Sequence, residues 1–342
     1  MKLEKSYGKL AQGSRILALL NSYKIDFTFV LFVAILCFQY NSIISMREVP
    51  GWDPSAYLAN ARNWMTNTPL YETFRPPLIS WLIVGIWMFT GENWSNVKWL
   101  QVVFTIGAGI ILYITLRRHQ GSLFALGVTG LVMLNIHVFL ASSQILTEGL
   151  SLFFVVATLY FLKSEKPNNW FLAGIMIGLT FASRYPIILQ SLVIFIVESL
   201  VRKDWKLSLR TIVGAVSAII TVVASVYIKT GTFQTALPKD TVLTFALSTF
   251  YLENSLEIWG VAILLVPLAF FFRGTYADRY NYSFIAWFIV SLLFWSANST
   301  NHQFRFAIQF MPAAYYLAIL AIENIVRGKI ALGPRANSKM KN

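Results

Sequence analysis

Long apolar runs, separated by short polar segments, recur from residue 27 to near the C-terminus and limit what this chain can fold into. A helix needs about 17 to 25 mostly apolar residues to cross the core of a bilayer. Only 13% of the residues are charged, against about 25% in soluble domains, so a water-soluble globule is excluded. We predict an all-α fold, a polytopic transmembrane helical bundle of about ten spans. The predicted spans are 27–45, 98–116, 122–140, 144–162, 170–183, 186–201, 208–228, 256–273, 281–297 and 305–326.

The net charge of +13 could suggest nucleic-acid binding, but the basic residues gather in short segments between these runs, so we expect no nucleic-acid partner. In membrane proteins Lys and Arg collect on the cytoplasmic side. The apolar run 76–90 decides the topology, because its roughly 15 residues are few for a spanning helix. If 76–90 lies along the membrane surface, every basic segment faces the cytoplasm. Those segments are 117–120, 163–166, 202–206, 273–279 and the tail from Arg327.

This topology divides the chain into three parts. Residues 1–26 are predicted to be a cytoplasmic N-terminal tail, 27–326 a transmembrane domain and 327–342 a basic cytoplasmic tail. Within the domain, 46–97 is predicted to be a large outer loop with juxtamembrane helices. The single cysteine, Cys37, excludes an intramolecular disulfide. We expect an integral protein of the plasma or inner membrane.

The outer loop carries an acid in an unusual setting, within the stretch REVPGWDPSAYLANARNW at 47–64. Asp53 precedes Pro54 at the start of a helical pattern, and Asp suits the N-cap while Pro suits the first helical position. We therefore predict a short interfacial helix with Asp53 as its N-cap. Capping alone would explain this carboxylate; the alternative is a reactive group at the outer membrane face.

A second acid, Glu148, lies just inside the outer end of a predicted span. A carboxylate at that depth is costly and marks either a functional site or a buried structural pair. Guanidinium groups on the same side could bind phosphate oxygens and stabilise a departing phosphate. The pattern predicts one pocket for transfer chemistry on a phosphate-bearing lipid. Its basic members are Arg75, Arg184, Arg305 and His302.

Each basic residue also has a structural interpretation. Arg75 and Arg305 would then reach lipid headgroups. Arg184 would mark a helix break before Pro186, and His302 would be an ordinary loop residue.

Other polar groups carry less information. Two acids near cytoplasmic helix ends are predicted to pair with arginines four residues on, Glu198 with Arg202 and Glu323 with Arg327. We find no zinc-type cluster and no phosphate-binding glycine loop. A divalent metal at Asp53 and Glu148 is possible in principle, but two isolated acids argue weakly for one. We expect no cofactor and no metal.

The order of these motifs resembles the GT-C superfamily of membrane glycosyltransferases, most closely its protein O-mannosyltransferase and aminoarabinose-transferase branch. The resemblance rests on an acid after the first span, the motif Y-x-x-F-R-P-P-L-x-x-W-L at 71–82, and a second acid at the head of a later span. It covers about residues 27–205 and returns at 304–320. The chain is short for this family, has no C-terminal soluble domain and lacks an acidic pair at the first motif.

The resemblance implies an enzyme that moves a sugar from a polyprenyl-phosphate donor to a lipid, glycan or protein acceptor at the non-cytoplasmic face, with inversion. Asp53 would be the catalytic base or would position the acceptor, and Glu148 would match the second acid, usually Asp in this branch. The donor phosphate would be held by Arg75, Arg184 and Arg305. Possible substrate contacts are Tyr57, Tyr71, Tyr185 and His302.

Two other functions are compatible with a polytopic bundle of this kind. The chain could be a transporter or a flippase for lipid-linked sugars, or a non-catalytic relative that binds polyprenyl lipid. Transporters commonly show internal repeats and polar groups near the bilayer midplane. Here no repeat is visible and the ionisable groups gather at the outer ends, which favours the enzyme.

Overall fold

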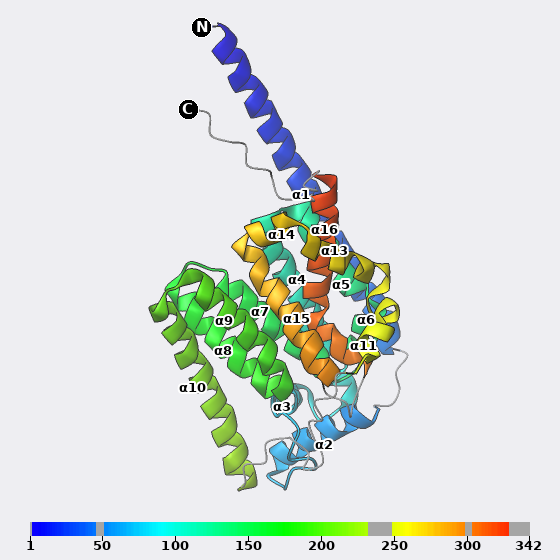
Figure 1. Cartoon of the computed structure of the whole chain (residues 1–342). Coiled ribbons are helices and arrows are strands. Elements are labelled where there is room, and N and C mark those ends of the chain that lie inside the picture. The colour runs from blue at the N-terminus through cyan, green and yellow to red at the C-terminus, as the bar shows by residue number, and fades with distance from the viewer. Residues whose placement is uncertain (1, 46–50, 232–247, 298–302, 328–342) are drawn as a thin grey trace.

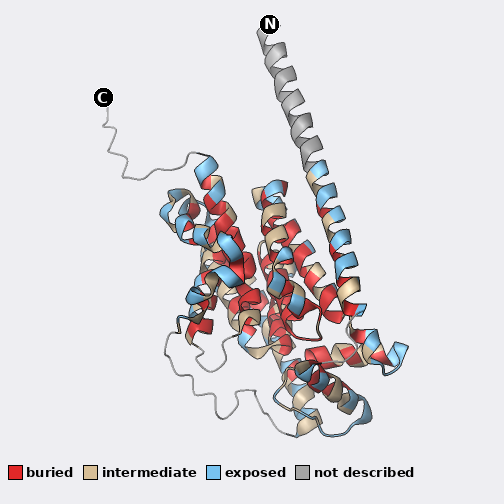
Figure 2. Cartoon of the chain, turned by 90° about the vertical axis from the view of Figure 1, so that its right-hand side faces the viewer, coloured by how far each residue is buried: buried red, intermediate tan, exposed pale blue. Residues whose placement is uncertain are grey.

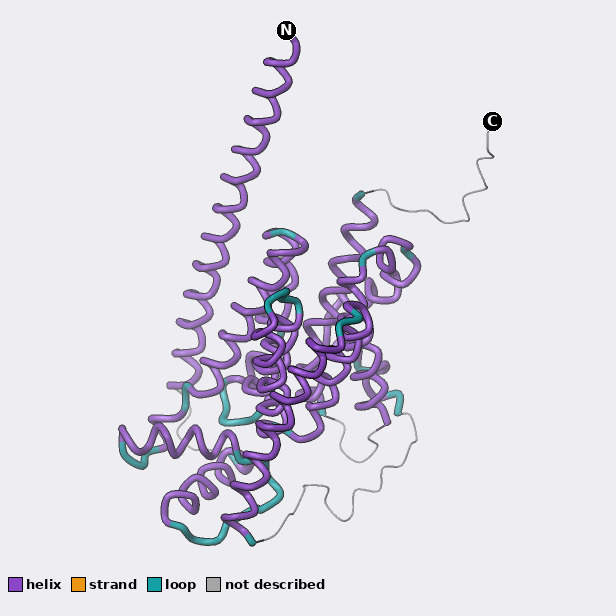
Figure 3. The backbone as a smooth tube through the Cα atoms, turned by 90° about the vertical axis from the view of Figure 1, so that its left-hand side faces the viewer, coloured by secondary structure: helices purple, strands orange, loops and turns teal. Residues whose placement is uncertain are grey.

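A computed structural model describes residues 2–45, 51–231, 248–297 and 303–327, with side chains from Tyr23 onward. Within these residues the chain forms helices and loops and no strand (Figure 3), which confirms the predicted all-α fold class. The α-helices are α1 (Lys2–Ser45), α2 (Trp52–Thr66), α3 (Leu78–Thr90), α4 (Leu100–Gln120), α5 (Ser122–Leu134), α6 (Ile136–Ser142), α7 (Glu148–Leu162), α8 (Pro167–Ser183), α9 (Ile188–Arg202), α10 (Trp205–Thr230), α11 (Phe250–Glu253), α12 (Ser255–Trp259), α13 (Leu265–Phe271), α14 (Arg273–Ala277), α15 (Tyr282–Ala297) and α16 (Met311–Val326). Short 3₁₀ helices are η1 (Trp94–Val97), η2 (Tyr185–Ile187), η3 (Gly260–Leu264), η4 (Arg279–Asn281) and η5 (Phe304–Phe310).

All ten predicted spans fall on helical segments, but fewer of them are long enough to cross a membrane. In the described part of the chain, 6 helices reach the necessary length and apolar character, or up to 7 if α5 and α6 count as one bent span. The apolar helix α7 and the segment 255–271 are shorter. The predicted count of about ten is therefore not reached by this measure, while the membrane-embedded bundle itself is confirmed.

The predicted span 122–140 is broken at Asn135, where α5 and α6 meet at an angle of 60°. Asn135 has extended backbone angles, and its side-chain oxygen accepts a hydrogen bond from the amide of His137 (2.9 Å). Its side-chain nitrogen donates to the carbonyl of Ile258 (2.7 Å) and the hydroxyl of Tyr315 (2.9 Å). Asn135 thus caps α6 and connects the break to Ile258 and Tyr315.

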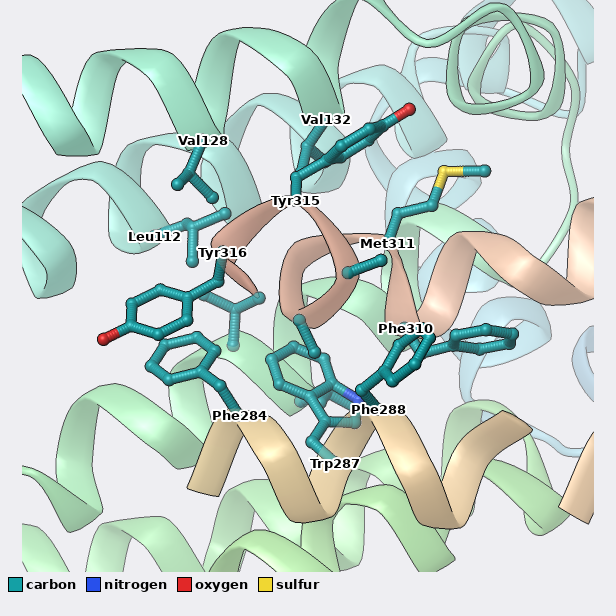
Figure 4. Packing of buried hydrophobic residues seen from close by; sticks show 14 of the residues in the cluster. Leu112, Val128, Val132, Phe284, Trp287, Phe288, Phe310, Met311, Tyr315 and Tyr316 are labelled. Carbon is teal, nitrogen blue, oxygen red and sulfur yellow. The ribbon is translucent and has the colours of Figure 1, made fainter. Parts of the chain in front are cut away.

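The core of the bundle is built around α16. Of the residues in the apolar stretch of α16, 83% are buried, against 22% in the corresponding stretch of α1, and Figure 2 shows the exposed face of α1. Phe284 of α15 stacks on Tyr316 of α16 with ring centroids 3.8 Å apart, beside Trp287 and Met311 (Figure 4). Lipid tails are as apolar as these side chains, so close packing and interhelical hydrogen bonds hold such a helix.

The short helices α2 and α3 cover one end of the bundle, and α14 and the end of α16 lie at the other (Figure 1). The 13 residues of α3 extend about 20 Å, too little to cross an apolar core of about 30 Å. Ile79, Ile83 and Trp87 on its inner face are buried, and α3 packs against α2. By length α3 is thus one of the shorter apolar helices and not a candidate span, while its position along the membrane surface stays a prediction.

At the opposite end, several of the predicted cytoplasmic segments contact one another. The ammonium group of Lys163 donates to the carbonyl of Tyr280 (3.1 Å), and the guanidinium group of Arg202 donates to the carbonyl of Lys163 (3.2 Å). The ring of His119 lies 4.2 Å from that of Tyr280. The basic segments thus share one end of the bundle, as the topology requires.

The two terminal segments differ in what the structure describes. The backbone of α1 is helical from Lys2, so the predicted tail 1–26 continues directly into the first span. Of the predicted tail 327–342, only Arg327 lies within the described residues.

Candidate active site

Asp53 lies in the first turn of α2, and the prediction that it caps this helix is wrong. The helix begins at Trp52 with Gly51 as N-cap, so Pro54 is its third residue. The sequence pattern misplaced the start because proline lacks an amide hydrogen and is tolerated throughout the first helical turn. The carboxylate of Asp53 instead accepts hydrogen bonds from Arg75 Nη2 (3.0 Å) and Arg305 Nη1 (2.9 Å).

Arg75 is delivered to this carboxylate by the loop between α2 and α3. The buried side chain of Asn60 holds the loop, since it donates to the carbonyl of Glu72 (2.9 Å) and accepts from the amide of Glu72 (3.1 Å). The carboxylate of Glu72 pairs with Arg75 Nε, and the Arg75 guanidinium lies over the ring of Tyr57, 4.8 Å from its centroid. Neither Asn60 nor Glu72 was predicted.

Glu148 is the first residue of α7 and is 1% exposed. Its Oε1 atom accepts a hydrogen bond from Arg184 Nη1 (2.6 Å) and lies 3.6 Å from Arg305 Nε. Its Oε2 atom is buried and has no hydrogen-bond partner among the described residues. The next residue must be small, because a Cβ atom on Gly149 would lie 2.2 Å from Thr105 Oγ1 of α4. This close approach of α7 to α4 fixes the depth of the carboxylate.

Arg184 and Arg305 come from breaks between helices. Arg184 ends α8 in an extended conformation before η2, and its guanidinium group lies 4.4 Å from the centroid of the Phe306 ring. Arg305 belongs to η5 and contacts both Asp53 and Glu148. Asp53 and Glu148 therefore share one guanidinium group and belong to one site.

Six charged side chains form a continuous chain of alternating sign. Each carboxylate contacts the next guanidinium group, and three charges of each sign leave the chain neutral. In order the six are Glu72, Arg75, Asp53, Arg305, Glu148 and Arg184.

This charge chain borders a cavity of about 300 Å³, which five of its members line. Tyr57 and Tyr185 line it too. Tyr71 is 58% exposed and does not line the cavity, and His302 lies outside the described residues. The structure thus brings together seven of the nine predicted site residues.

The surrounding charges and burial set the protonation states of Asp53 and Tyr57 in the cavity. Burial raises the pKa of Asp53, but the hydrogen bonds and positive charges of Arg305 and Arg75 outweigh it, and the pKa lies below its usual value. Burial raises the pKa of the Tyr57 hydroxyl. At neutral pH Asp53 is therefore ionised and Tyr57 is a neutral phenol.

The acids of the cavity are already engaged by arginines. No group of three or more His, Cys, Asp or Glu side chains in the described ranges is arranged to hold a metal ion. The arrangement favours anion chemistry, since guanidinium groups are suited to phosphate and carboxylate oxygens.

The bundle, with two short helices beside a cavity of carboxylates and guanidinium groups, has the GT-C fold of membrane glycosyltransferases. It superposes on the crystal structure of ArnT from Cupriavidus metallidurans bound to undecaprenyl phosphate with a TM-score of 0.71 at 15% identity, covering 86% of this chain and 60% of that one. For the apo structure of the same protein the TM-score is 0.69 at 17% identity, covering 88% of this chain and 61% of that one. The chain thus spans about three fifths of the length of these structures.

Comparison of the sequence with protein-family models finds a match for part of the chain. Residues 74–228 match the model of the dolichyl-phosphate-mannose-protein mannosyltransferases, a segment that contains Arg75, Glu148 and Arg184. A search of curated proteins finds no significant match. Residues 74–228 are therefore similar to this mannosyltransferase family, and the chain has the GT-C fold, as the order of its motifs predicted.

Proposed function

We propose that this protein is a membrane glycosyltransferase that moves a sugar from a polyprenyl-phosphate donor to a lipid, glycan or protein acceptor. The observation that carries the proposal is the neutral chain of alternating charges along the cavity. It offers carboxylates and guanidinium groups within reach of one bound molecule. The undecaprenyl phosphate bound to ArnT supports a donor of this class.

The guanidinium groups would hold the donor phosphate. In the structure each of these guanidinium groups contacts a carboxylate. An incoming phosphate would therefore replace a carboxylate as the partner of an arginine. Arg305 is the readiest to exchange, because it is 29% exposed and lies 3.6 Å from Glu148. As the glycosidic bond breaks, negative charge grows on the phosphate, and Arg75, Arg184 and Arg305 stabilise it.

Asp53 would act as the general base. It is ionised, and when Arg305 turns to the phosphate, a carboxylate oxygen becomes available to an acceptor hydroxyl or amine. The acceptor atom forms a bond to the anomeric carbon while the bond from that carbon to the phosphate oxygen breaks. The proton passes to Asp53, and polyprenyl phosphate leaves. One displacement of this kind inverts the anomeric centre. Glu148 stays paired with Arg184 and positions the reacting groups.

We also propose that the cavity opens at the non-cytoplasmic face. The support is indirect: the basic segments gather at the opposite end of the bundle from α2 and α3 (Figure 1), and such segments face the cytoplasm in membrane proteins.

A transporter or flippase is the competing function. Such proteins use discontinuous helices to bind substrate near the bilayer midplane, and the break between α5 and α6 is a feature of that kind. Its polar residue, Asn135, is satisfied by Ile258 and Tyr315, whereas Glu148 in the cavity keeps one oxygen unpartnered among the described residues. This difference favours the cavity as the working site.

The test is sugar transfer by the purified protein from radiolabelled lipid-linked sugars of a membrane extract, with the product identified by mass spectrometry. Asp53→Asn keeps the shape but cannot accept the proton, so we expect transfer to fall by about 10² to 10⁴-fold. The control is Asp26→Asn, which alters a carboxylate paired with Arg117 at the other end of the bundle. Full transfer by Asp53→Asn would refute the mechanism. Because the acids face arginines, we expect EDTA to leave transfer unchanged.

A further inference from the structure

A second, larger cavity lies at the end of the bundle opposite the candidate active site. It measures about 890 Å³ and is bordered by the turn between α4 and α5 and by the last turns of α16. Ile25 of α1 lies on its border.

The walls of the groove are apolar and accessible. Leu123 of α5 is 72% exposed, and Ile322 and Val326 of α16 are 40% and 79% exposed. Gly127 faces the same space from α5, where its hydrogen leaves room beside Ile319. In a membrane these surfaces contact lipid chains.

The rim of the groove is basic. Arg117 is paired with Asp26 (2.5 Å), and Arg327 is paired with Glu323. Arg118 differs from both, because no carboxylate of the described residues lies within salt-bridge distance of it. Within the described residues, its guanidinium group donates to the Tyr160 hydroxyl (3.1 Å) and lies over the Tyr160 ring, 4.8 Å from its centroid. As far as the described residues go, the rim thus presents one positive charge without a paired carboxylate, above an apolar wall.

We propose that this groove binds an acidic phospholipid, with its phosphate at Arg118 and its acyl chains along α5 and α16. Basic pockets between transmembrane helices on the cytoplasmic side are suited to anionic headgroups. The groove lies at the same end as the basic segments 117–120 and 163–166, where anionic lipids of a cytoplasmic leaflet would meet it. The proposal does not depend on the sugar-transfer activity.

The experiment is native mass spectrometry of the full chain in detergent, titrated with phosphatidylglycerol or with phosphatidylcholine of the same acyl chains. We expect phosphatidylglycerol to bind more tightly, and Arg118→Gln to weaken it by about 5-fold, since one arginine near the surface contributes about 1 kcal/mol. Leu123→Trp fills the groove without changing charge and should weaken both lipids. The control is Arg210→Gln, an exposed arginine that donates to Asn168 near the same end.

Three outcomes would overturn the proposal. The first is equal binding of the two lipids by the unaltered chain. The second is an Arg118→Gln variant that binds phosphatidylglycerol as the unaltered chain does, or an equal loss with Arg210→Gln, which would mark a diffuse surface charge effect. The third is a Leu123→Trp variant that binds both lipids as the unaltered chain does, which would show that the acyl chains do not lie in the groove.

Discussion

Two clusters of buried charge lie at opposite ends of this bundle, and they are built differently. At the end opposite the candidate active site, Lys163 Nζ lies 2.5 Å from Glu198 Oε1 and donates to the carbonyl of Tyr280. The Ser283 hydroxyl also donates to Glu198, and both charged side chains are less than a tenth exposed. In the cavity, by contrast, Arg305 is shared between Asp53 and Glu148.

The difference separates structure from function. The Lys163–Glu198 pair is enclosed by its own partners from α7, α9 and α15, and it ties those helices together. The charged groups of the candidate active site share partners along the charge chain and border the cavity. Glu148 Oε2 has no hydrogen-bond partner among the described residues. A buried polar atom left open costs free energy, and such sites are where ligand binding recovers it.

Among variants that compare the two clusters, the largest expected effect is the difference in activity between changes at Glu148 and at Glu198. Glu148→Gln removes the charge that holds Arg184 and Arg305, and we expect sugar transfer to fall by about 10²-fold. Glu198→Gln should leave the rate per folded molecule unchanged. The measurement is the transfer assay, normalised to protein that elutes as a monodisperse peak. Equal losses in the two variants would erase the distinction between the clusters.

For the stability of the folded protein we expect the larger effect at the Lys163–Glu198 pair. Lys163→Met leaves Glu198 buried without its cation, which costs about 3–5 kcal/mol. The double change Lys163→Met and Glu198→Leu removes both charges and should recover most of that loss. Unfolding in mixed micelles measures both variants. A double variant as unstable as the single one would show that the pair is not an isolated structural unit.

A smaller effect is expected at the residue that holds the Arg75 loop. Asn60→Ala removes two hydrogen bonds to the backbone of Glu72 and should cost about 1–3 kcal/mol. Because Arg75 then loses its position, the KM for the donor should rise more than kcat falls. Thr66→Ala on the same helix is the control, since its hydroxyl is exposed and bonds only within the α2 end and its loop. An unchanged KM would dismiss the positioning role.

The smallest effect is a shift with pH. The pKa of Asp53 is depressed in the folded protein, so the stabilisation it brings is present above the unfolded value of about 3.9 and is lost as the pH falls through the folded value. Arg305→Gln removes one of the two cations, and the pKa of Asp53 should rise. The acid limb of the pH–rate profile should then move to higher pH. A limb that stays in place would mean that Asp53 is not the base.

The sequence located the charged residues that line the cavity because each has a local signal: Asp53 precedes a proline, Glu148 lies at the head of an apolar run, and the arginines lie beside prolines or apolar runs. It missed Asn60 and Glu72, whose hydrogen bonds join side chain to backbone across twelve positions and leave no pattern. Tyr71 was included because it begins the motif at 71–82, but its side chain turns outward.

Salt bridges between distant segments were also beyond what the sequence could predict. The prediction of Glu323 with Arg327 is confirmed, whereas Glu198 pairs with Lys163 of a different helix rather than with Arg202. Spacing along one helix indicates which partners are near, but the choice between them depends on which neighbour the packing buries. The run 122–140 was predicted as one continuous span, although Asn135 is its only asparagine and asparagine is a favoured N-cap residue.

The deep burial of α16 has a consequence for how the protein is made. The helix that fills the middle of the bundle leaves the ribosome after the helices that surround it. Until it arrives, α4, α5 and α15 face an unfilled space, and neither Asp53 nor Glu148 has Arg305, which precedes α16 directly. Insertion of α16 therefore closes the core and completes the charge chain in one event, so a chain synthesised only up to α15 has no finished cavity.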